Sequence, residues 1–151
     1  MLQTAILDEI LVSHAAQVVI DEFGLAMATH PGSKRDRNED RIAVARIAAP
    51  NTETYSVAVV CDGVGGSQSG DQAAAIAIAS IIADLAQQQR HLALKDLAVA
   101  LVRRADEQVR TELQGRGATT LVMLVATARG QLVCASVGDS RAYSWDPKLS
   151  K

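Results

Sequence analysis

The sequence is poor in aromatic residues and cysteine, and it carries no strong net charge. Aromatic residues make up 3% of its 151 residues, so few side chains could stack on nucleic-acid bases. The formal net charge of −2 creates no field that would attract a polyanion or an acidic membrane surface. We therefore expect neither nucleic acid nor a membrane among the partners of this chain.

Long apolar runs and a disulfide framework are also missing. Polar residues interrupt every apolar run well before the roughly 18 residues that a membrane span needs. The two cysteines, Cys61 and Cys134, each lie in an apolar, strand-like run, where a reduced thiol behaves as a small hydrophobic group. Residues 1–17 lack the basic region and cleavage site of a signal peptide. We therefore expect a cytoplasmic protein.

What the sequence does have is a clear hydrophobic periodicity, which predicts an α+β fold with mainly antiparallel sheets. Apolar spacing predicts an N-terminal helix over residues 2–19, so we divide the chain into a helical segment (1–20) and a domain (21–151). Two further helices should pack together on one face of a sheet. These helices are expected at 69–88 and about 94–113, and strands at 23–29, 42–47, 55–61, 119–128, 131–137 and 141–145.

One stretch stands out because a β-branched run ends abruptly in Asp62 and a cluster of glycines. Glycines let the main chain approach a small ligand such as a metal ion or a phosphate. The next helix starts at about Ser69, so its free N–H groups point back toward Asp62. The glycine spacing does not fit a dinucleotide-binding or P-loop motif.

Three acidic residues, Glu39, Asp62 and Asp139, each lie where a predicted strand meets a turn. Carboxylates at strand ends can converge at one end of a sheet, and Mg²⁺ and Mn²⁺ prefer such oxygen ligands. Taken alone, Asp62 could instead cap a turn, and the charged run 34–40 could be a solvated loop. No group of histidines and cysteines has the spacing of a zinc site.

Four motifs, in order along the chain, decide between these interpretations. The motifs are Arg35-x-x-Asn38-Glu39-Asp40, Asp62-Gly63-x-Gly65-Gly66 with Gly70, Gly117-Ala118-Thr119-Thr120, and Gly138-Asp139-Ser140-Arg141-Ala142-Tyr143. Together they closely resemble the successive motifs of the metal-dependent type 2C protein serine/threonine phosphatases, over residues 23–145.

The resemblance implies a fold and a metal site. The fold would be a β-sandwich of antiparallel sheets flanked by helices (αββα), with two Mg²⁺ or Mn²⁺ ions at one end in the complete domain. By position, Asp62 would bridge both ions, and Glu39 with the Gly63 carbonyl would complete the protein ligands of one. Asp139 would belong to a further, weaker metal, and Asp40 would hydrogen-bond metal-bound water.

The resemblance also implies an activity, the hydrolysis of phosphoserine and phosphothreonine in phosphoproteins. Arg35 would bind the substrate phosphate, a role that suits a forked guanidinium group. Arg35 and Asp62 would then be the catalytic residues, and the nucleophile would be a metal-activated water.

Three departures from the family pattern keep other functions open. Val64 stands where members commonly have Met or His, and Ser67 stands where many bacterial members have His. The sequence to Lys151 also lacks the family's later Asp-Gly and Asp-Asn motifs, so we interpret it as truncated after Gly138-Asp139-Ser140-Arg141. The alternatives are a non-catalytic module that binds a protein partner and a regulatory protein that uses the fold without metals. Half a sandwich would expose strand edges, so self-association or a covering partner is expected.

Overall fold

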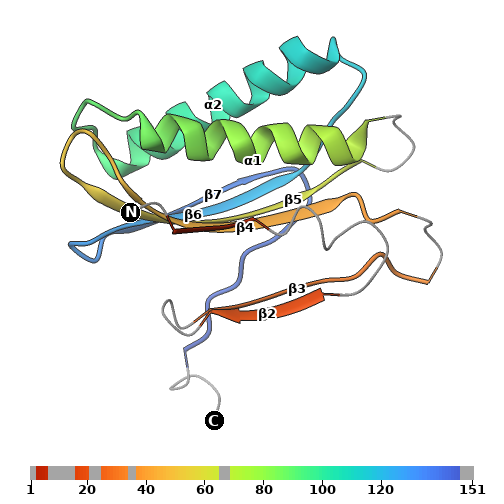
Figure 1. The fold of residues 1–151 in the computed structure, drawn as a ribbon, viewed down its shortest axis with the longest axis horizontal. Coiled ribbons are helices and arrows are strands. Elements are labelled where there is room, and N and C mark those ends of the chain that lie inside the picture. The colour runs from red at the N-terminus through yellow and green to blue at the C-terminus, as the bar shows by residue number, and fades with distance from the viewer. Residues whose placement is uncertain (1–2, 7–15, 21–24, 34–36, 65–68, 147–151) are drawn as a thin grey trace.

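A computed structural model describes residues 3–6, 16–20, 25–33, 37–64 and 69–146, and it has an α+β fold, as predicted. The larger sheet has five strands in the order β1-β4-β5-β6-β7, and every neighbouring pair is antiparallel (Figure 1). These strands are β1 (Gln3–Ile6), β4 (Asp40–Ala48), β5 (Thr54–Asp62), β6 (Leu121–Thr127) and β7 (Leu132–Val137).

Two helices, α1 (Gly70–Ala86) and α2 (Leu94–Leu113), cover one face of this sheet (Figure 1). Both helices bury apolar residues that recur at helical spacing, as the hydrophobic periodicity of the sequence predicts. Ile81 and Leu85 of α1 and Leu101 of α2 are at most 1% exposed. Burying a side chain of this size stabilises a fold by roughly 1.5–3 kcal/mol, so these rows fix the helices to the sheet.

Strand β5 is the centre of the sheet, because β4 and β6 pair with it on either side. Val59 lies opposite Ala43 of β4 and Met123 of β6, and all three are buried on the face that the helices cover. Successive strand residues point to opposite faces, so Val60 lies on the other face and is 41% exposed.

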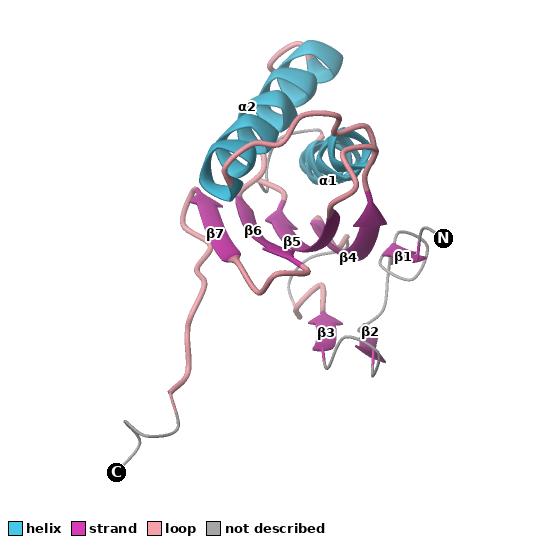
Figure 2. Ribbon diagram, turned by 90° about the vertical axis from the view of Figure 1, so that its left-hand side faces the viewer, coloured by secondary structure: helices cyan, strands magenta, loops and turns pink. Residues whose placement is uncertain are grey.

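That other face is covered only in part, by a two-stranded antiparallel sheet of β2 (Ala16–Ile20) and β3 (Leu25–Thr29). Figure 2 shows this small sheet on the side away from the helices. Met27 of β3 packs with Val44 of β4 in a second apolar cluster. Leu124 and Leu132 stay 38% and 64% exposed, so the described residues do not form a complete sandwich.

Two predicted elements are wrong. The N-terminal helix over residues 2–19 is contradicted by β1 and β2, which occupy parts of that span. Val18, Val19 and Ile20 are β-branched and pair with β3, and such pairing overrides a weak helical periodicity. The predicted strand 141–145 is absent as well, because in the described part of the chain no strand pairs with it. The division at residue 20 stays a prediction.

Candidate metal and phosphate site

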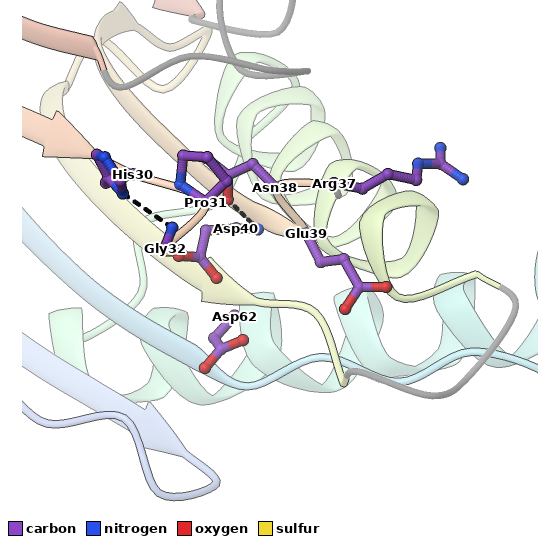
Figure 3. A pocket seen from close by; sticks show the side chains of 8 residues that line it. All are labelled: His30, Pro31, Gly32, Arg37, Asn38, Glu39, Asp40 and Asp62. Atoms are coloured by element: carbon purple, nitrogen blue, oxygen red, sulfur yellow. Dashed lines mark hydrogen bonds between the residues drawn. The ribbon is translucent and has the colours of Figure 1, made fainter. Parts of the chain in front are cut away.

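Acidic side chains from two neighbouring strands line a pocket of about 250 Å³ at one end of the larger sheet. Figure 3 shows Asp40 and Asp62 next to one another and the Glu39 carboxylate extending the same way. The sequence motifs that carry these residues are thus brought together. Besides these three residues the lining comprises His30, Pro31, Gly32, Arg37 and Asn38.

Asp40 and Asp62 face each other directly, because they form the last residue pair of the antiparallel β4–β5 ladder. Like charges in this arrangement repel one another. A cation between them would relieve this repulsion. Glu39 is adjacent in sequence, and its backbone carbonyl accepts a hydrogen bond from the Gly63 N–H at 3.3 Å.

The position of Asp62 is fixed by the threonine pair of the third motif. The backbone N–H of Asp62 donates to the Thr120 hydroxyl at 3.1 Å, and its carbonyl accepts from the Thr120 N–H at 2.8 Å. The Thr119 hydroxyl donates to the same carbonyl at 3.0 Å. Thr120 also lies 2.6 Å from the Ser140 hydroxyl of the fourth motif. Three of the motifs therefore meet at the end of β5.

Two glycines are required where three backbone segments cross beside Asp62. A Cβ on Gly63 would lie 2.5 Å from the carbonyl carbon and oxygen of Gly70 and 2.8 Å from the carbonyl oxygen of Glu39. A Cβ on Gly70 would lie 2.9 Å from the Val64 carbonyl oxygen. Both positions are therefore restricted to glycine by close backbone approach.

Basic side chains border the same pocket. Arg37 lines it and forms an ion pair of 2.7 Å with Asp71, in the first turn of α1. His30 also lines it, and its Nδ1 accepts a hydrogen bond of 2.8 Å from the Gly32 N–H. An accepting Nδ1 has no proton, so in the neutral ring the proton is on Nε2. Sequence reasoning gave neither residue a role, because both lie in loops whose position depends on the whole fold.

Two of the predicted metal ligands, Gly63 and Asp139, do not line this pocket. Arg35 lies outside the described residues, so its predicted phosphate contact stays a prediction. Asp139 follows β7, is exposed, and does not line the pocket. Its link to the site is indirect, through the neighbouring Ser140 and Thr120.

The donors suit a hydrated ion better than a cage made only of protein. In the described ranges no three His, Cys, Asp or Glu side chains are grouped closely enough to hold a metal ion. Mg²⁺, however, usually keeps several waters and binds proteins through one or two carboxylates. Asp62 with Asp40 or Glu39 supplies hard oxygen donors of this kind beside open space.

The thiol of Cys61, which precedes Asp62 in the chain, takes no part in metal binding or nucleophilic chemistry. Cys61 is 0% exposed on the helix side of β5, and burial raises its pKa to about 12, with a hydrogen bond to the Thr119 side chain acting in the opposite direction. Because the thiolate is the nucleophile, Cys61 stays an inert core residue near neutral pH.

Comparison with known proteins agrees with the sequence motifs. Residues 31–149 match the profile of the Protein phosphatase 2C family, which spans most of the chain. The chain therefore belongs to the protein phosphatase 2C family.

Individual relatives are bacterial. The chain is 31% identical over 125 residues to the serine/threonine phosphatase stp of Listeria monocytogenes, a match that covers 76% of this chain and 47% of that protein. The corresponding phosphatases of Listeria welshimeri and Listeria innocua are 28% and 30% identical. The chain thus spans about half the length of the curated relatives it matches. No solved structure gives a significant match.

Neither α1 nor α2, the helices of the described ranges, is long and apolar enough to cross a bilayer.

Proposed function

We propose that this chain supplies the metal-binding and phosphate-binding half of a metal-dependent protein serine/threonine phosphatase, which hydrolyses phosphoserine and phosphothreonine in phosphoproteins. The observation that carries the proposal is the convergence of Glu39, Asp40 and Asp62 on one pocket. The family membership and the relatives' printed activity support it.

Each residue has a role in this proposal. Asp62 and Glu39, with the Gly63 carbonyl, would hold Mg²⁺ or Mn²⁺, and Asp40 would orient a water in the pocket. A bound divalent ion supplies Lewis acidity toward a phosphoryl oxygen and lowers the pKa of water. Arg35 would bind the substrate phosphate through its guanidinium fork.

The proposal also includes the predicted further metal ion, the second sheet and the cell compartment. Asp139 would serve a further, weaker metal, and two ions would be present in the complete domain. A second antiparallel sheet, extending β2 and β3, would complete the sandwich over the exposed face of the larger sheet. The cell compartment would be the cytoplasm.

Hydrolysis of p-nitrophenyl phosphate in the presence of Mn²⁺ tests the activity. We expect Mn²⁺-dependent turnover that is lost in Asp62→Ala and retained in Glu107→Ala, because Glu107 is an exposed α2 residue that does not line the pocket. Absence of turnover in a well-folded chain, or equal turnover in Asp62→Ala, would exclude catalysis by this chain.

A second candidate function is a non-catalytic module that binds a protein partner or regulates signalling. The observation in its favour is the apolar surface left open on the larger sheet, together with Tyr143 and Trp145, which are 84% and 79% exposed. Exposed apolar surface of this kind is typical of interaction sites. A chain that binds Mn²⁺ but shows no turnover would favour this candidate.

A further inference from the structure

A charged side chain, Arg41, is buried beneath the start of α1. It is the second residue of β4 and lies on the helix-covered face of the sheet, in line with Ala43 and Ala45. Its relative exposure is 9%. Arginine is rarely buried to this extent unless its donors are engaged, so its contacts indicate what it does there.

Those contacts join the chain on both sides of Glu39. One guanidinium nitrogen of Arg41, Nη1, donates to the carbonyl oxygens of Asn38 and Asp40, each at 2.9 Å. The other nitrogen, Nη2, lies 3.9 Å from the Asp71 carboxylate in the first turn of α1. A single planar group therefore ties the segment 38–40 to the helix that follows the Asp62 loop.

Other bonds hold the same segment from different directions. The Asn38 side chain donates to the Thr29 hydroxyl at 2.8 Å and accepts from the Asp40 N–H at 3.0 Å. The Glu39 carbonyl accepts from the Gly63 N–H at 3.3 Å. Arg41 completes this set through its hydrogen bonds to the Asn38 and Asp40 carbonyls.

We propose that Arg41 is a positioning residue, which fixes Glu39 and Asp40 relative to Asp62 and so sets the affinity of the pocket for a divalent cation. This inference rests on the proposed function, because it takes these carboxylates as the cation ligands. Side chains that orient metal ligands without touching the metal typically change metal affinity by about 10- to 100-fold when they are replaced.

The geometry requires arginine in particular. Lysine carries its charge on one compact ammonium group, whereas the arginine fork can donate to two carbonyls and still face a carboxylate. Arg41→Lys should therefore restore only part of the cation affinity that Arg41→Met removes. If Arg41 only stabilised the fold through its ion pair, Mn²⁺ affinity would not fall in the order wild type, Arg41→Lys, Arg41→Met.

The test uses the whole chain, with Mn²⁺ as the probe in titration calorimetry and circular dichroism to verify folding. We expect about tenfold weaker Mn²⁺ binding in Arg41→Met, a smaller loss in Arg41→Lys, and a loss in the same direction in Asp71→Asn. Arg46→Met is the matched control, because Arg46 lies on the same strand but is exposed on the opposite face.

Two results would overturn the inference and leave the metal site intact. One is a folded Arg41→Met that binds Mn²⁺ as tightly as the wild type. The other, which decides the matter if Arg41→Met does not fold, is unchanged affinity in both Arg41→Lys and Asp71→Asn.

A different result would contradict the proposed function instead. If the wild-type chain does not bind Mn²⁺, the proposed metal site is wrong. Amide hydrogen exchange then tests the positioning role of Arg41 separately. The inference predicts faster exchange of the Asp40 and Gly63 amides in Arg41→Met than in Arg46→Met. Equal exchange in the two variants would overturn it.

Discussion

Asp40 and Asp62 lie directly opposite one another at the open end of β4 and β5, so two negative charges share the last pair of a β-ladder. Directly opposed like charges on a sheet are destabilising, on a scale where favourable cross-strand pairs contribute roughly 0.2–1 kcal/mol. The chain keeps this unfavourable pair beside a pocket that Glu39 also lines. In the proposed site a bound cation would offset this repulsion, which leads to the first prediction.

Asp62→Asn should have opposite effects on stability without and with a divalent cation. Without one, the substitution removes the repulsion from Asp40 and should raise the free energy of unfolding by a few tenths of a kcal/mol, up to about 1. With saturating Mn²⁺, the wild type gains stability from ligand binding and the variant does not. Urea denaturation with and without Mn²⁺ measures both effects. If Mn²⁺ raised the free energy of unfolding equally in the wild type and in Asp62→Asn, Asp62 would not be a cation ligand.

Gly63→Ala should be strongly destabilising, because the added Cβ would meet the backbone of Gly70 at 2.5 Å. We expect a loss at the upper end of the roughly 1–3 kcal/mol that overpacking costs, together with weaker Mn²⁺ binding. Gly130→Ala is the comparison, because Gly130 has φ +79° but open space around its Cβ position. We expect this variant to lose about 1–2 kcal/mol of stability from the positive φ. Its Mn²⁺ affinity should not change. Thermal unfolding and calorimetry give both quantities, and equal losses in the two variants would refute the crossing of backbones at Gly63.

The two cysteines should differ sharply in reactivity. Cys134 is exposed, whereas Cys61 is buried and burial raises its pKa from 9.0 to about 12. Because a raised pKa favours the thiol, Cys61 should be protonated and unreactive through pH 8. A disulfide reagent at low protein concentration should titrate one thiol in the native chain and two in denaturant, and none in native Cys134→Ser. Two native thiols reacting at similar rates would contradict the burial of Cys61.

The uncovered face of the larger sheet should make the chain associate with itself. Leu124 and Leu132 lie on that face and are 38% and 64% exposed, and exposed apolar patches drive association. Sedimentation should show a mass that rises with concentration, and Leu124→Lys with Leu132→Lys should shift the chain toward the monomer. A matched double substitution on α2, Arg103→Lys with Glu107→Lys, should leave the mass unchanged. A wild-type chain that stays monomeric at high concentration would rule out this role for the face.

The sequence was sufficient for the parts of the fold that depend on local periodicity. The buried rows of α1 and α2 follow from their 3.6-residue spacing, and the strand that carries Asp62 follows from its β-branched run. The N-terminal helix was wrong because short apolar spacings in residues 2–19 suit a helix or a strand, and pairing of Ala16–Ile20 with β3 decided between them.

The site could be predicted only in outline. The motifs identified Glu39, Asp40 and Asp62, which the structure places in one pocket. The part that Arg41 plays could not be read from the sequence, because it depends on which face of β4 the side chain occupies and on α1 passing above it. His30 was likewise given no role, since only the tertiary fold brings its loop to the carboxylates.

The most direct test of the central claim is to locate a paramagnetic ion on the chain. In proton–nitrogen correlation spectra, substoichiometric Mn²⁺ should broaden the amide signals of Asp40 and Gly63 first, and Asp62→Asn should abolish that broadening. Broadening that begins instead at the acidic residues of α2, such as Asp96 and Asp106, or none at all, would contradict a cation site between β4 and β5.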